Sequence, residues 1–125
     1  MNILITDDHA NVRRGLRELL VDAFPGAHFS EASSGDEVLT VLHSSQHDIL
    51  LLDINMPGRS GMEVLKDVKH FYPLLPVIMV SVQPENQYAS RCLQAGASAY
   101  VNKNSVSEDL APAIHKIIDD EAKSL

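Results

Sequence analysis

Four consecutive branched apolar residues, Ile49 to Leu52, restrict how this chain can fold more than any other feature of its sequence. An apolar run of this length, without polar alternation, is typical of a strand that is buried on both faces of a sheet, as in parallel sheets covered by helices. The run stops at Asp53, which places a carboxylate at the end of a buried strand. An α/β fold is therefore expected.

The rest of the chain alternates short apolar runs with helical patterns. Strands are predicted at residues 3–5, 27–32, 49–52, 77–80 and 99–101. Helices are predicted between and after them, because apolar residues there recur at spacings of three and four. The stripes are Val12, Leu16, Leu19 and Leu20; Val38, Val41 and Leu42; Met62, Leu65 and Val68; and Leu110, Ile114, Ile117 and Ile118, with a weaker helix over about 84–96. Five strands alternating with five helices imply parallel pairing through right-handed crossovers.

Local signals mark several helix ends. Ser60 begins a capping box at the start of the third helix. Gly96 is expected to end the fourth helix in a left-handed conformation. Ser105 or Ser107 is expected to cap the last helix. Pro112 lies farther along that helix and lacks a backbone donor, so a disturbed first turn or a kink is expected there.

Composition narrows the class of protein. At 125 residues, 45% apolar and 22% charged, the chain is expected to form one domain, residues 1–125, around one core. The net charge of −7 argues against direct binding of nucleic acid, which needs clustered basic residues. Arg13, Arg14 and Arg17 are close together, but they are expected on the solvated face of a helix. A single cysteine, Cys92, and the lack of any apolar run near the roughly 20 residues of a membrane span favour a cytoplasmic domain without membrane contact.

Polar residues stand where four of the predicted strands end. Asp7 and Asp8 end the first strand, Asp53 ends the third, Ser81 ends the fourth, and Lys103 comes just after the fifth. Working residues of open parallel sheets gather beyond the carboxyl ends of the strands. All five side chains are therefore expected to converge on one edge of the sheet.

The chemistry of this set points to phosphoryl transfer. Three carboxylates at one edge repel each other, which raises the pKa of at least one unless cations compensate. Lys103 is one such cation, and hard oxygen ligands suit Mg²⁺ or Mn²⁺ as another. A neutralised Asp53 can attack a phosphorus centre while the metal and Lys103 balance charge on the phosphoryl oxygens. Ser81 can donate a hydrogen bond to an arriving oxygen, so the set predicts an aspartyl phosphate.

Over essentially its whole length the chain resembles the receiver domains of two-component response regulators. The segments that carry the resemblance are Thr6–His9, Leu52–Gly58, Ser81 at its strand end and Ala95–Lys103. Each motif alone is modest, but their joint order and spacing are specific. The resemblance implies a flavodoxin-like doubly wound sheet in the strand order 2-1-3-4-5. Residues 8–16 and 96–100 look most like the NarL/FixJ (LuxR-type) group, whose receivers usually precede a helix-turn-helix DNA-binding domain.

The resemblance also implies which residues form the acceptor and metal site. Asp53 would be the phosphoacceptor and a metal ligand, and Asp8 would be a direct metal ligand. Asp7 would act on the metal through water, and the backbone carbonyl of Asn55 would supply a further ligand. Mg²⁺ or Mn²⁺ is the implied cofactor.

The switch and the partners follow from the same resemblance. Ser81 would be the switch hydroxyl, Lys103 would contact the phosphoryl oxygens, and Tyr100 would change rotamer when Ser81 moves. A sensor histidine kinase would supply the phosphoryl group to this signalling acceptor, which is not expected to be an enzyme although it assists its own phosphorylation and dephosphorylation. A homodimer could form through the fourth helix, fifth strand and fifth helix, or through the first and fifth helices. DNA would be reached only through an output domain outside this chain.

Two positions depart from the usual receiver pattern. Many receivers have a cis proline after the lysine, whereas Asn104 follows Lys103 here. A cis bond without proline costs roughly 3 kcal/mol, so this bond is either trans or strained. Val82 stands where a small residue is common, and we hypothesise that it narrows the approach to Asp53 and slows both phosphorylation by small donors and hydrolysis. Gln83 lies where receiver side chains influence the hydrolytic water.

Each residue also has a structural alternative. Taken singly, Asp8 could be a helix N-cap, Asp53 a strand-end carboxylate, and Lys103 a solvated loop lysine. Tyr100 could be a core aromatic. His9 is interpreted as a helix-start residue. Convergence on one edge weakens these alternatives, because three acids and a lysine meet no structural need there.

Other functions fit less well. A haloacid-dehalogenase-like phosphatase also uses a strand-end aspartate with Mg²⁺, but it needs a second Asp where this chain has Asn55. FMN binding is disfavoured because Asp7 and Asp8 would repel the phosphate, and an EF-hand because Pro57 occupies a ligand position. A stand-alone receiver and a pseudo-receiver that binds partners without phosphorylation remain as alternatives.

Overall fold

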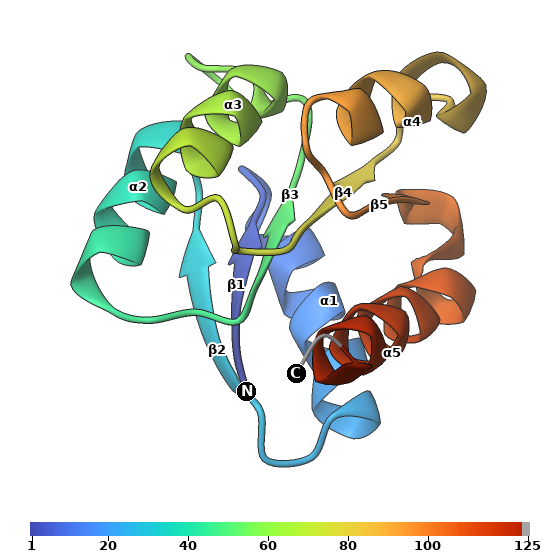
Figure 1. Ribbon diagram of the computed structural model, residues 1–125. Helices are drawn as coiled ribbons and strands as arrows, with labels where there is room; N and C mark the ends of the chain where they lie inside the picture. The colour runs from blue at the N-terminus through green and yellow to red at the C-terminus, as the bar shows by residue number, and fades with distance from the viewer. Residues whose placement is uncertain (124–125) are drawn as a thin grey trace.

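The apolar run at the centre of the sequence is a central strand. The computed structural model describes residues 1–123, and in it strand β3 (Ile49–Leu52) is buried throughout. β3 belongs to a parallel sheet with the order β2-β1-β3-β4-β5 (Figure 1). The other strands are β1 (Asn2–Thr6), β2 (His28–Ala32), β4 (Val77–Ser81) and β5 (Ala99–Asn102). The predicted α/β class and strand order 2-1-3-4-5 are confirmed; the last two residues of the expected domain, 1–125, lie outside the described residues.

Helices cover both faces of the sheet (Figure 1). α2 (Gly35–Ser44), α3 (Gly61–Phe71) and α4 (Glu85–Gln94) lie on one face, and α1 (Ala10–Ala23) and α5 (Val106–Lys123) lie on the other. Successive side chains of a strand point to opposite faces. Leu50 and Leu52 accordingly join the apolar cluster under α2, α3 and α4, whereas Ile49 and Leu51 join the one under α1 and α5. Both faces are buried, so every residue of β3 has to be apolar.

The helix ends follow the predicted signals at the start of α3 and the end of α4. The Ser60 hydroxyl accepts a hydrogen bond from the Glu63 N–H at 3.3 Å. Gly96 has a φ of +109°, which confirms the left-handed stop after α4. Among the described residues, no helix is both long enough and apolar enough to cross a bilayer.

The predicted cap of the last helix is wrong. A 3-10 turn, η1 (Lys103–Ser105), runs directly into α5, so Ser105 lies in that turn and Ser107 lies inside the helix. The capping side chain is instead Asn102, which accepts from the Asn104 N–H at 2.9 Å. The apolar stripe starts only at Leu110 and therefore gave no sign of this earlier turn. α5 continues through Pro112, which lies within the helix body and not in its first turn.

Candidate functional site

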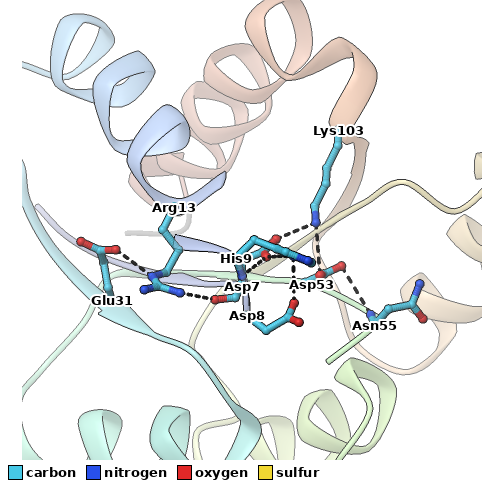
Figure 2. A network of polar contacts seen from close by, with 8 residues as sticks. All are labelled: Asp7, Asp8, His9, Arg13, Glu31, Asp53, Asn55 and Lys103. Atoms are coloured by element: carbon cyan, nitrogen blue, oxygen red, sulfur yellow. Dashed lines mark hydrogen bonds and ion pairs between the residues drawn. The ribbon is translucent and has the colours of Figure 1, made fainter. Parts of the chain in front are cut away.

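Two predicted acids and the predicted lysine meet at the carboxyl edge of the sheet (Figure 2). Asp7 follows β1, Asp53 follows β3 and Lys103 follows β5. Thr6 and Leu52 are register partners across β1 and β3, which sets the next two residues side by side. The Lys103 Nζ lies 2.6 Å from Asp7 Oδ2 and 3.1 Å from Asp53 Oδ2. Lys103 therefore bridges the two buried carboxylates.

Asp8 and His9 complete the acidic end of β1. The His9 Nδ1 lies 3.1 Å from both Asp7 Oδ1 and Asp8 Oδ1, and the His9 N–H donates to Asp7 Oδ1 at 2.8 Å. His9 is the N-cap residue of α1, although its side chain makes no capping bond. The interpretation of His9 as a helix-start residue is thus confirmed, and Asp8 is not the N-cap. Sequence reasoning missed the contact between the His9 ring and both acids.

Arg13 holds the backbone of the same loop from the side of α1. Its guanidinium donates to the Asp7 carbonyl oxygen at 2.6 Å and to Glu31 Oε1 at 2.8 Å. The Arg13 side chain is only 17% exposed, so the expectation that it faces solvent is wrong. The Arg17 side chain is 50% exposed and agrees better with that expectation. The reason is the pairing of Ile5 with Glu31 across β1 and β2, which places a carboxylate within reach of the first turn of α1.

Burial and neighbouring charges move the two buried carboxyls in opposite directions. Burial raises the pKa of Asp53, and the charge of Asp7 adds to this effect while Lys103 opposes it. Burial acts on Asp7 too, but Lys103 and the His9 N–H together outweigh it, so the pKa of Asp7 is lowered. The pKa of Lys103 is raised despite burial, because it faces two carboxylates. Asp53 is therefore the carboxyl whose pKa is raised, with burial as the main cause and repulsion by Asp7 as a smaller one.

The acidic end of the sheet offers oxygen atoms that suit a hard cation. Ligand atoms of Asp7, Asp8 and His9 lie within 4.8 Å of one another. Asp8 Oδ1 is buried and accepts no hydrogen bond from the described residues, although the His9 ring lies at ion-pair distance, whereas Asp7 Oδ2 faces the Lys103 ammonium at 2.6 Å. Buried carboxylate oxygens short of donors are what a bound Mg²⁺ would complete. The carboxylates of Asp7 and Asp8 therefore suit the expected metal, whereas Asp53, a predicted direct ligand, is not part of this group.

A cavity of about 430 Å³ opens beside these acids and is lined in part by Asp8, His9 and Asn55. The Asn55 N–H also donates to Asp53 Oδ1, at 3.4 Å. A larger cavity, of about 650 Å³, lies beyond the C-terminal ends of α2 and α3 and contains none of the predicted site residues. Of these two cavities, the smaller one lies at the acidic edge, because Asp8 lines it.

Ser81 and Tyr100 are connected through one loop residue. Ser81 is fully buried at the end of β4, and its hydroxyl oxygen accepts from the Gln83 N–H at 3.2 Å. The Tyr100 hydroxyl donates to the Gln83 carbonyl at 2.6 Å, and burial raises the pKa of Tyr100, which keeps this hydroxyl a donor. Val82, which stands between Ser81 and Gln83 in the chain, is 57% exposed. Its effect on access to Asp53 stays a prediction.

Gly61 is a site-supporting residue that sequence reasoning missed. It opens α3, and its N–H donates to the Ile54 carbonyl at 2.6 Å. A Cβ at this position would lie 1.9 Å from the carbonyl oxygen of Asp53. The first turn of α3 therefore packs directly against the backbone that carries Asp53, a contact that requires glycine. No sequence signal marks it, because Gly61 stands at an ordinary helix start.

Comparison with known proteins identifies the family. Residues 3–115 match the response regulator receiver domain. The chain belongs to this family. The response regulator UvrY of Escherichia coli strain K12 is 31% identical to this receiver over 117 residues, which is 94% of this chain and 54% of UvrY. The receiver thus spans about half the length of the curated relatives it matches.

Solved structures agree with this assignment. A LuxR-family two-component response regulator from Aurantimonas sp. SI85-9A1 matches with a TM-score of 0.87 and 28% identity, over 95% of this receiver and 85% of that chain. The response regulator TrrA of Thermotoga maritima, solved in complex with Mg²⁺-BeF, matches with a TM-score of 0.82 and 30% identity. The match covers 92% of this receiver and 96% of the TrrA chain. The expected likeness to LuxR-type receivers is confirmed. Response regulators are signalling proteins, as the sequence predicted.

Proposed function

We propose that this receiver accepts a phosphoryl group on Asp53 from the phosphohistidine of a partner histidine kinase. The observation that carries the proposal is the Lys103 ammonium held between Asp7 and Asp53, at 2.6 and 3.1 Å, beside the carboxylate of Asp8. An Asp53 oxygen would form the new bond to phosphorus as the bond from phosphorus to the imidazole nitrogen breaks. The bonding electrons leave with the imidazole, so the protein needs no general base.

The chain's own groups prepare this transfer. Lys103 offers positive charge next to the Asp53 oxygen that it contacts, where charge on the phosphoryl oxygens would develop. Asp8 and Asp53 would hold Mg²⁺ or Mn²⁺ directly, together with the Asn55 carbonyl, and Asp7 would act through water. The bound cation would supply charge neutralisation for the carboxylates and the phosphoryl oxygens. TrrA, solved with Mg²⁺-BeF, supports the choice of Mg²⁺ as the cation.

Signal output follows from movement of Ser81. Its hydroxyl would donate to a phosphoryl oxygen, the loop after β4 would move with it, and Tyr100 would follow. The face formed by α4, β5 and α5 would then change its affinity for a partner or a second copy, with α1 and α5 as the alternative dimer face. Relatives of about twice this length support a further domain in the full regulator, and we propose that this domain binds DNA. We propose that the phosphoryl transfer takes place in the cytoplasm, where a single unpaired cysteine is usual. We regard the receiver as a signalling acceptor rather than an enzyme.

Intact-mass analysis after incubation with acetyl phosphate tests the proposal. The wild-type chain should gain one phosphoryl group in Mg²⁺ and none in EDTA, and Asp53→Asn should gain none. Asp22→Asn, on the exposed side of α1, is the matched control and should behave as wild type. Modification that persists in Asp53→Asn, or that is independent of Mg²⁺, would contradict the assignment. Mg²⁺ binding without any modification would indicate a pseudo-receiver.

A further inference from the structure

Asn102, the last residue of β5, is hydrogen-bonded in two directions. Its Nδ2 donates to the carbonyl oxygen of Gln83 at 3.3 Å, in the loop that follows Ser81. Its Oδ1 accepts from the N–H of Asn104 at 2.9 Å, in the turn that carries Lys103. One side-chain amide therefore contacts both segments that the proposed reaction depends on.

The sheet explains why one residue reaches both segments. β4 and β5 are parallel, and Ser81 and Asn102 are register partners at their ends. The chain segments that leave the two strands therefore run side by side. Gln83 is tied at both of its backbone groups: its N–H donates to Ser81, and its carbonyl accepts from Tyr100 and Asn102. Three hydrogen bonds thus hold Gln83 in this arrangement, in which the Ser81 oxygen is an acceptor.

The contact on the other side depends on the unusual residue after the lysine. No peptide bond among residues 1–123 is cis, so Lys103 and Asn104 are joined in trans. A proline at position 104 could not donate to Asn102, because proline has no N–H. Asn102 also has the side chain that suits a capping position. The Asn104 side chain is exposed, so its backbone N–H is the group that matters.

We propose that Asn102 is a positioning residue that couples the loop after Ser81 to the turn that carries Lys103. Its amide holds the loop in the arrangement in which Tyr100 binds the Gln83 carbonyl. Loss of that contact frees the loop, so that Ser81 reaches an incoming phosphoryl oxygen more readily and phosphorylation becomes faster. This effect on rate rests on the proposed function, whereas the coupling between the two segments does not.

Amide hydrogen exchange measured by NMR tests the coupling without phosphorylation. Asn102→Ser keeps an acceptor for the Asn104 N–H but removes the donor to Gln83, so the Gln83 N–H should exchange about fivefold faster, as expected for loss of one neutral hydrogen bond. Asn104→Pro removes the N–H, and Asn104→Ala keeps it. The Gln83 N–H should exchange faster in the proline variant than in the alanine variant, although the Asn104 N–H is bonded to Asn102 and not to the loop. Equal exchange in these two variants overturns the coupling.

Phosphorylation by acetyl phosphate with Mg²⁺, followed by intact mass, tests the positioning role. Asn102→Ser should gain the phosphoryl group about fivefold faster than wild type, and Asn104→Ala should match wild type. Faster amide exchange with an unchanged phosphorylation rate overturns the positioning role and leaves Asn102 a structural residue. A wild-type chain that takes no phosphoryl group contradicts the proposed function instead, and the exchange experiment still decides the coupling.

Discussion

Gly61→Ala should damage both the stability of the receiver and its phosphorylation. The added Cβ would lie 1.9 Å from the Asp53 carbonyl oxygen and 2.7 Å from the Ile54 Cα, whereas real Cβ contacts stay beyond 3.0 Å. Both neighbours are backbone atoms, so α3 and the Asp53 loop must separate by more than 1 Å. Overpacking of this kind costs about 3 kcal/mol of unfolding free energy.

The same separation should displace the reacting group. Asp53 is held by Lys103 at 3.1 Å, and a shift of its backbone alters that distance. Misplacement by about 1 Å can cost a factor of roughly a hundred in rate. We therefore expect phosphorylation by acetyl phosphate with Mg²⁺ to fall about a hundredfold in Gly61→Ala, measured under conditions in which the variant is folded.

Gly15→Ala is the matched control, because an added Cβ there meets no atom within 4 Å. Gly15 lies inside α1 and is exposed, so alanine should raise the unfolding free energy by up to about 1 kcal/mol through helix propensity. Urea unfolding, monitored by circular dichroism, gives the unfolding free energies of the Gly61→Ala and Gly15→Ala variants. A Gly61→Ala chain as stable and as reactive as Gly15→Ala would refute the argument from close packing.

Three further predictions address charge and access. The raised pKa of Asp53 makes a contribution to stability that is present below the ordinary value of 3.8 and lost as pH rises through the raised value. The lowered pKa of Asp7 contributes above 3.8 and is lost as pH falls through the lowered value. In metal-free buffer at pH 7, Asp53→Asn should thus raise the urea midpoint and Asp7→Asn should lower it; changes of the same sign would contradict the assignment. Arg13→Ala should cost about 2 kcal/mol in urea unfolding, since two charge-assisted bonds are lost, against about 0.5 kcal/mol at most for Arg14→Ala, which is exposed. Val82→Ala should speed acetyl-phosphate labelling, and unchanged labelling and dephosphorylation rates would refute the hypothesis that Val82 narrows the approach.

The order of the elements was accessible from local pattern. The four-residue apolar run predicts β3, and its end predicts the position of Asp53, because burial on both faces leaves a signature in the sequence itself. Crossover rules then place Asp7 and Lys103 at the same edge without any knowledge of side-chain distances. The start of α5 was not accessible in this way, because a side chain from the preceding strand, Asn102, sets it.

The sequence by itself determined which chemistry gathers at the carboxyl edge: three acids, a hydroxyl and a lysine, each at a strand end. Only the tertiary structure decided how these groups share their charge, because burial raises the pKa of Asp53 while the contacts with Lys103 and the His9 N–H outweigh burial and lower the pKa of Asp7. The contacts by which Gly61 and Asn102 support the site were likewise decided only by the tertiary structure. They arise where strand register and helix packing bring distant segments within bonding range, and no local sequence pattern records such distances.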